Sequence, residues 1–132
     1  MNTLMSGQLL CVRCDDLPWK PSTFAPGVFV KDVALTDGLE MQIVRLEPGA
    51  RLPLHTHELP EFIYILEGDL TLGGQRASQG WASVASAGSV HSDVHSEAGC
   101  VFVLVDRPLC ALVPNTSRVF CLGITPRPNQ IR

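Results

Sequence analysis

Short apolar and alternating stretches run through the chain between glycines and prolines, and none keeps a helical period over ten or more residues. Residues 27–35 (GVFVKDVAL) and 41–46 (MQIVRL) predict two strands, joined by a hairpin turn at Thr36-Asp37-Gly38. Residues 100–105 (CVFVLV) are apolar throughout, which predicts a strand buried on both faces. The pattern therefore favours an all-β protein.

Further short strands complete this pattern. We expect a strand over 62–66 that ends in a turn at Gly68-Asp69, then strands over 69–72 and 75–77 joined at Gly73-Gly74. Residues 81–84 and 118–125 predict two more strands, with a turn over 86–89 between them in the chain. Leu9, Leu10 and Val12 fit either an additional edge strand near the start or a contact with a partner. Many short strands at such spacing are typical of a sandwich or barrel.

Composition bounds the class of protein. The chain has 132 residues, enough for one domain with a core of its own, and 45% hydrophobic with 17% charged residues exclude a disordered chain. The net charge of −3, with Lys and Arg scattered, argues against a nucleic-acid partner. The first residues lack the positive charge and long apolar run of a signal peptide, and no segment is apolar enough to span a membrane. We therefore expect a cytoplasmic protein.

The chain contains five cysteines. Cys11 and Cys14 form a C-x-x-C pair, which fits either a zinc or redox site or two plain thiols. No second C-x-x-C accompanies it, so we interpret the pair as plain thiols. Cys100 and Cys121 lie in apolar runs and are expected to be small core residues.

Candidate metal chemistry concentrates in residues 49–68 (GARLPLHTHELPEFIYILEG). His55 and His57 lie two residues apart and share a face in a strand, and Glu61 follows beyond the break at Pro60. His91 is the third histidine of interest. Two or three imidazoles and a carboxylate suit zinc, iron, manganese or nickel, although an H-x-H pair alone is also compatible with ordinary histidines.

Several other polar and aromatic residues keep two interpretations. His95 and Asp93 are either solvated groups at the rim or groups that lie around a metal or its ligand, and the rim is favoured. A second set lines either the inside of the barrel or its outer face, and strand parity alone leaves both open: Arg45, Tyr64, Trp81 and Phe102.

The spacing of these residues resembles the cupin family. The first cupin motif, G-x5-H-x-H-x3-E-x6-G, fits in register at five positions: Gly49, His55, His57, Glu61 and Gly68. The second, G-x5-P-x-G-x2-H-x3-N, fits at Gly80, Gly88 and His91, with Ser86 in place of proline and His95 in place of asparagine. The resemblance implies a cupin jelly-roll (double-stranded β-helix) barrel. It also implies one divalent transition metal per chain, held in the wider mouth by His55, His57, Glu61 and His91.

More narrowly, several segments resemble the cupin domain of ChrR-type zinc anti-sigma factors: Trp19-x-Pro21, Gly27-Val28, residues 45–49 and Glu97-x-Gly99-Cys100. The resemblance also extends to free-standing cupins that cleave carbon–carbon bonds of diketones. It therefore implies either an enzyme, such as an Fe(II)-dependent dioxygenase acting on a dicarbonyl or hydroxyketone, or a non-catalytic metal-bound sensing module. The few residues before Trp19 lead us to favour the enzyme.

We divide the chain into a lead segment, residues 1–18, and a single cupin domain, residues 19–132. Two apolar edge segments, near residues 8–13 and 118–125, would need covering, so we also expect a homodimer. The other expected partner is a small-molecule ligand or substrate.

Overall fold

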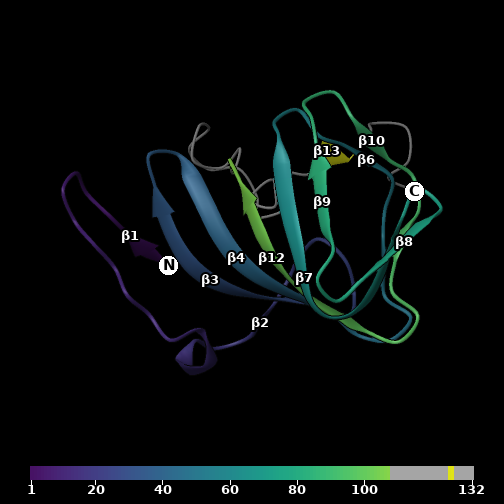
Figure 1. Cartoon of the computed structure of the whole chain (residues 1–132), viewed down its shortest axis with the longest axis horizontal. Helices are drawn as coiled ribbons and strands as arrows, with labels where there is room; N and C mark the ends of the chain where they lie inside the picture. Colours follow the sequence, from purple (N-terminus) through teal and green to yellow (C-terminus); the bar gives the residue numbers. More distant parts are fainter. Residues whose placement is uncertain (108–124, 127–132) are drawn as a thin grey trace.

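The computed structural model describes residues 1–107 and 125–126, and this part of the chain is built of strands (Figure 1). Its one helical segment is a 3₁₀ turn, η1 (Cys14–Asp16). The strands in the first half are β1 (Asn2–Thr3), β2 (Lys20–Pro21), β3 (Val28–Thr36), β4 (Leu39–Leu46), β5 (Arg51–Leu52) and β6 (His55–Thr56). The later strands are β7 (Glu61–Leu72), β8 (Gln75–Ser78), β9 (Ala82–Ala85), β10 (Val90–His91), β11 (Val94–His95), β12 (Cys100–Asp106) and β13 (Thr125–Pro126). The prediction of an all-β jelly-roll is confirmed.

A large curled sheet forms most of the molecule. Its main path is β1-β3-β4-β12-β7-β11-β5, and β2, β8 and β9 add to it at β3 and β7. A small sheet, β10-β6-β13, lies at the end where the curled sheet bends over (Figure 1). The predicted hairpin turn between β3 and β4 is present, with φ of 51° at Asp37 and 74° at Gly38, as a primed turn requires.

The predicted turn at Gly68-Asp69 is wrong, because the long strand β7 includes both residues. The strand continues through these residues to Leu72, and a bulge opposite the Val101–Phe102 step bends it instead. Gly68 has φ of +76°, and a Cβ at this position would overlap the carbonyl oxygen of Gly99. The glycine therefore allows a bend and a close strand contact, not a strand end.

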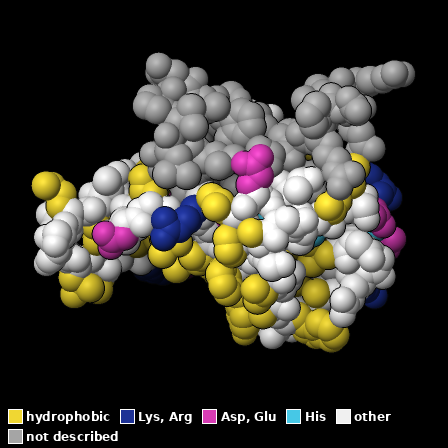
Figure 2. All heavy atoms as spheres, turned by 90° about the horizontal axis from the view of Figure 1, so that it is seen from above, with side chains coloured by type: hydrophobic (Ala, Val, Ile, Leu, Met, Phe, Trp, Pro, Cys, Tyr) yellow, Lys and Arg dark blue, Asp and Glu magenta, His cyan; other side chains and the backbone are white. Residues whose placement is uncertain are grey.

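Strand β12 is buried on one face only, so the expectation of burial on both faces is wrong. Cys100, Phe102 and Leu104 are buried, whereas the alternate valines are partly exposed. Hydrophobic side chains also reach the surface elsewhere, as the yellow groups along the lower edge of Figure 2 show. On β7, Phe62 and Tyr64 are 52% and 50% exposed. An apolar run therefore does not establish burial when the outer face of a sheet is itself apolar.

The start of the chain differs from the prediction as well. Residues 8–13 form no strand; the edge is formed by β1, which pairs in parallel with Ala34 and Leu35 of β3. Of the expected strand over 118–125, all but Thr125 lies outside the described residues. The homodimer and the division at residue 18 stay predictions. No helix among the described residues is long and apolar enough to cross a membrane.

The inside of the curled sheet is apolar along most of its length and polar at one end. The apolar part contains Val28, Val44, Leu46, Ile65 and Phe102, all nearly inaccessible to solvent. At the other end, three carboxylates occupy one register row across β4, β12 and β7: Glu40, Asp106 and Glu61. They are 2%, 2% and 3% exposed, so the row is sealed from water. This polar end of the barrel is where the histidines lie.

The bend at Gly68 makes a prediction about stability. Gly68→Ala should reduce the free energy of unfolding by about 2–4 kcal/mol, since it adds a steric overlap with Gly99 to the strain of a positive φ. Gly74→Ala is the matched control, because φ there is +82° but an added Cβ meets nothing within 4 Å. That variant should lose only about 1 kcal/mol in urea denaturation. Equal losses in both variants would contradict the close-contact explanation.

Candidate metal centre

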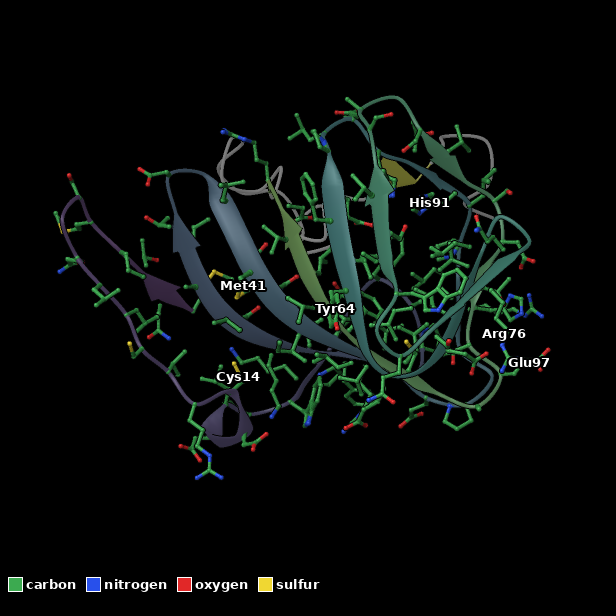
Figure 3. The ribbon with its side chains drawn as sticks, viewed as in Figure 1. Cys14, Met41, Tyr64, Arg76, His91 and Glu97 are labelled. Atoms are coloured by element: carbon green, nitrogen blue, oxygen red, sulfur yellow. The ribbon has the colours of Figure 1, made fainter. Side chains whose placement is uncertain are left out.

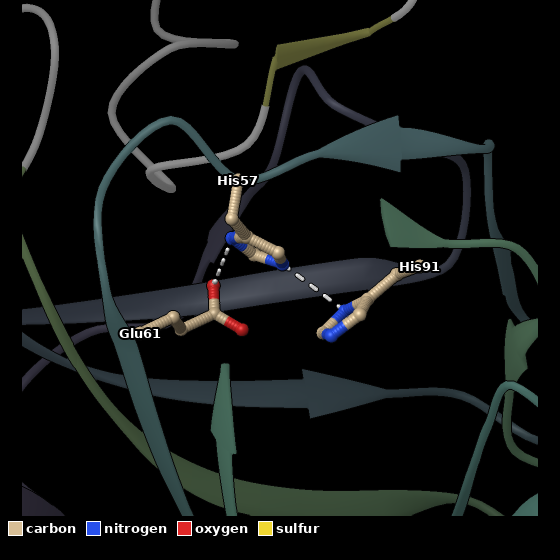
Figure 4. Close-up of side chains that lie close together, drawn as sticks. All are labelled: His57, Glu61 and His91. Carbon is tan, nitrogen blue, oxygen red and sulfur yellow. Dashed lines mark hydrogen bonds and ion pairs between the residues drawn. The ribbon is translucent and has the colours of Figure 1, made fainter. Parts of the chain in front are cut away.

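Three side chains converge at the polar end of the barrel: His57, Glu61 and His91 (Figure 4). His57 lies just after β6, where its backbone N–H donates to Ser89 O at 2.9 Å and its carbonyl accepts from Gly88 N at 2.7 Å. These bonds fix the loop against the turn before β10. Glu61 is the first residue of β7, and His91 is the last residue of β10. Strand pairing thus brings together residues that are far apart in the sequence.

The distances within this group are short. His57 Nε2 lies 3.0 Å from His91 Nδ1, and His57 Nδ1 lies 3.7 Å from Glu61 Oε2. The two imidazole rings meet edge to face, with centroids 4.3 Å apart. One nitrogen or carboxylate oxygen from each of the three residues lies within 4.8 Å of the other two.

Burial controls the charge of these groups. His57 is fully buried and Glu61 is 3% exposed, whereas His91 is half-buried. Burial, followed by repulsion from Asp106, raises the pKa of Glu61 well above its ordinary value. Burial lowers the pKa of His91, which favours the neutral imidazole. A neutral imidazole is the form that binds a metal.

These side chains fit a divalent metal. Glu61 Oε2 is buried and has no hydrogen-bond partner, so a bound cation would stabilise the carboxylate form that burial disfavours. Ligand atoms about 2.1 Å from one metal lie about 3.0–3.4 Å apart when they are neighbours around it. With one ligand atom from each residue, the three atoms lie within 4.8 Å of one another, so the side chains would have to rotate toward a common metal to reach this range. Imidazole and carboxylate together suit iron, manganese, zinc or nickel, as the sequence predicted.

His55 occupies a place consistent with its predicted role as a further ligand. Its backbone on β6 pairs directly with that of His91 on β10. The two strands are therefore antiparallel neighbours in the small sheet. The full set of His55, His57, Glu61 and His91 stays a prediction.

Sequence reasoning missed Asp106, which lies opposite Glu61 in the register of β12 and β7. Asp106 is 2% exposed, and neither of its carboxylate oxygens has a hydrogen-bond partner. Burial raises its pKa from 3.8 to about 7. Extending the run over 100–105 by one residue would have placed Asp106 on the same face as Phe102 and Leu104. Its position beside Glu61 needed the strand register.

Asp93, with its side chain 46% exposed, fits the favoured interpretation as a rim residue, whereas the His95 side chain is only 14% exposed and does not fit a solvated histidine. His95 Nδ1 lies 2.9 Å from Asp93 Oδ1, which also accepts from Arg51 Nη1 at 3.2 Å. His95 does not share the face of His91 within one strand, because β10 and β11 are separate strands. Neither residue belongs to the metal-binding group.

The structure also shows which residues of the second set line the inside of the barrel: Arg45, Tyr64, Trp81 and Phe102 were the candidates. Phe102 points inward and lines the cavity next to Glu61 and His91. Tyr64 and Trp81 are each 50% exposed, and Arg45 lies over the rings of Trp19 and Phe29. Of the four residues, only Phe102 lines the inner cavity.

The three cysteines that the structure describes take no part in the metal-binding group. Cys11, Cys14 and Cys100 are free thiols. Cys100 is 3% exposed, as expected of a core residue, and burial, followed by the charge of Asp69, raises its pKa to about 12. Cys110 and Cys121 lie outside the described residues.

The cavity that meets Glu61 and His91 is narrow and apolar. Its free volume is about 20 Å³, room for roughly one water molecule. Apart from these two residues its walls are hydrophobic: Val28, Val44, Leu52, Ile63, Leu70, Leu72, Val94, Phe102 and Leu104. No Lys or Arg among the described residues lines it, which disfavours a phosphorylated ligand.

Comparison with known proteins identifies the family. The profile of the ChrR cupin-like domain matches residues 7–110, and the chain therefore belongs to this family of cupins. No curated protein sequence matches the chain.

Solved structures with the same fold have different roles. A candidate acetylacetone dioxygenase from Methylibium petroleiphilum is 19% identical, with a TM-score of 0.70 over 79% of this chain and 80% of that one. An acetylacetone dioxygenase from Acinetobacter johnsonii is 14% identical, with a TM-score of 0.64 over 77% and 74%. The anti-sigma factor ChrR, in complex with SigE from Rhodobacter sphaeroides, is 19% identical, with a TM-score of 0.60 over 72% of this chain and 50% of that one. At these identities the likeness establishes the fold alone.

The metal-binding group makes a prediction about metal affinity. His57→Ala should weaken binding of a divalent metal by more than about 100-fold, because it removes a ligand and leaves the charge of Glu61 buried. Metal content after purification and the metal-dependent rise in melting temperature measure the effect. His95→Ala removes a histidine outside the group and should retain the metal. A His57→Ala variant that keeps its metal would rule out this assignment.

The buried carboxylates predict an unusual pH dependence for the metal-free protein. Because the pKa of Asp106 is raised in the folded state, the folded state keeps a proton that the unfolded state releases. The free energy of unfolding should therefore fall as the pH rises from about 4 to 7. The shift from 3.8 to about 7 corresponds to at most about 4 kcal/mol. Asp106→Asn should flatten the profile in urea denaturation, whereas Asp37→Asn, in an exposed turn, should not. Parallel profiles for wild type and Asp106→Asn would contradict this cause.

Proposed function

We propose that the protein is a metalloenzyme that cleaves a small dicarbonyl or hydroxyketone with dioxygen, and that Fe(II) is its metal. The observation that carries this proposal is the composition of the site: a buried imidazole, a half-buried imidazole and a buried carboxylate, with no thiolate among the described residues. Closed structural zinc sites use four protein ligands, commonly thiolates, whereas nitrogen and oxygen sites with fewer ligands leave positions for exchangeable groups. With His55 added, at least one such position would remain on a five- or six-coordinate metal.

In this proposal His57, Glu61 and His91, together with His55, hold the metal. When bound, Fe(II) would supply the position at which a chelating substrate and dioxygen meet. The remaining functions belong to the protein. The lowered pKa of His91 keeps its imidazole neutral, and the apolar walls around Phe102 exclude water and charged competitors.

The proposed reaction inserts both atoms of dioxygen and breaks one carbon–carbon bond. A 1,3-dicarbonyl compound and O₂ give one carboxylic acid and one 1,2-dicarbonyl fragment, so no separate reductant is needed. Two proteins of the same fold are named for acetylacetone, which is a small 1,3-diketone. The uncharged, hydrophobic lining of the cavity supports a substrate of this kind.

A second candidate function is a metal-bound sensing or regulatory module without turnover. The observation that favours it is the cavity of about 20 Å³, which has no room for a diketone as it stands. The ChrR neighbour is an anti-sigma factor in complex with SigE. A sensor would keep its metal tightly and respond to an oxidant or ligand by a change of structure.

Both candidates fit a reducing compartment. Fe(II) persists under reducing conditions, and the three cysteines among the described residues are free. We therefore propose a cytoplasmic location for the protein.

Oxygen uptake distinguishes the enzyme from the sensor. The Fe(II)-loaded protein should consume dioxygen with a panel of 1,3-diketones and hydroxyketones, and ¹⁸O₂ should label both products. Zinc-loaded protein and Fe(II)-loaded His91→Ala serve as inactive controls, and His95→Ala should remain active. If the loaded wild type consumes no oxygen with any member of the panel, the sensing module becomes the better interpretation.

A further inference from the structure

A surface groove lies next to the narrow inner cavity, between β8, β9 and the start of β10. Its volume is about 350 Å³, within the range of small-molecule sites. Three exposed hydrophobic residues line it: Trp81, Val84 and Val90, which are 50%, 65% and 42% exposed. Gln75 and Ser83 add polar side chains. The exposed lining of the groove is therefore more polar than apolar, with these three hydrophobic side chains as its apolar part.

The groove and the inner cavity share two lining residues, Leu72 and His91. These two side chains thus form the wall between the surface and the space beside Glu61. Figure 3 shows His91 beside β10, on the side of the molecule away from Cys14 and Met41. Of the three residues in the metal-binding group, His91 alone is not fully buried. Among the described residues, solvent therefore reaches the metal-binding group from the side of His91.

Leu72 is placed to move. It is the last residue of β7, half-buried, and is followed by the two-residue turn Gly73-Gly74. Its backbone pairs with Gln75 and with Val94, and Gly73 N donates to Asp93 O at 3.1 Å. A rotation of the Leu72 side chain requires none of these backbone bonds to break. Rotamer changes of this kind are fast and cost little.

We propose that this groove is the entrance for the ligand of the metal site, with Leu72 and His91 as the gate between groove and metal. The inference rests on metal binding as proposed above. The ligand class is a small, uncharged 1,3-dicarbonyl compound, which places its apolar edge on Trp81 and Val84 and its oxygens toward His91. The inner cavity by itself has room for only one water molecule. A larger ligand could still reach the metal site, because most of it would lie in the groove outside the gate.

Fluorescence tests occupancy of the groove without any turnover. The chain has two tryptophans, Trp19 and Trp81, and Trp19 packs against Arg45 on the outer face of the sheet. In Trp19→Phe, loaded with zinc, acetylacetone should change the emission of Trp81 in a saturable manner. Trp81→Phe, which retains only Trp19, should show no saturable change. A response from Trp19 but none from Trp81 would overturn the proposal.

A steric block tests the entrance itself. Val84→Trp fills the groove and should slow acetylacetone binding to the Fe(II)-loaded protein by about tenfold or more in anaerobic stopped-flow absorbance. Phe62→Trp adds a bulky ring on the same sheet but outside the groove and should bind at the wild-type rate. Leu72→Ala should speed binding and admit bulkier diketones. Metal content is measured for each variant, so that a lost site is not mistaken for a blocked one.

The outcomes separate this inference from the proposed function. Slow binding in Val84→Trp, with no oxygen uptake by wild type, would retain the entrance and discard the dioxygenase. Oxygen uptake by wild type, with Val84→Trp binding as fast as Phe62→Trp, would retain the enzyme and overturn the entrance.

Discussion

Burial of ionisable groups at one end of an otherwise apolar barrel is the constraint on which the rest of the structure depends. Glu61 and Asp106 are neighbours across two strands, and both are nearly inaccessible to water. A carboxylate in such surroundings either keeps its proton or requires a cation. The neighbouring imidazoles of His57 and His91 supply neutral nitrogen ligands for that cation. The same features that destabilise the metal-free barrel at high pH therefore prepare it to bind a metal.

The strands of the large sheet hold this arrangement in place. The carboxylate row follows from the registers of β4, β12 and β7, and the histidines come from the small sheet that faces it. Gly68 lets β7 bend without interruption, so one strand carries Glu61 at its start and Leu72 at its end. Glu61 of the metal-binding group and Leu72 of the proposed gate are thus the two ends of a single strand.

Family membership leaves the two proposed functions open, since the structures that share the fold are named as acetylacetone dioxygenases and as the anti-sigma factor ChrR. The two functions place different demands on the same site. An enzyme must admit and release a small molecule at every turnover, whereas a sensor needs a metal that exchanges slowly. Access through the wall formed by Leu72 and His91 is therefore the property that distinguishes them most directly.

The sequence by itself determined the all-β class, the strands over 28–36, 39–46 and 100–106 to within a few residues, and the identity of the candidate ligands. Alternation, turn residues and the spacing of His55, His57, Glu61 and His91 are local signals, so a single chain carries them. Whether Gly68 ends or bends a strand depended on its contact with Gly99, and whether Trp81 faces inward depended on how the sheet curls. Asp106 became part of the site only through its pairing with Glu61, 45 positions earlier in the chain. Register between distant strands is fixed by packing of the whole sheet, and so only the tertiary structure decided it.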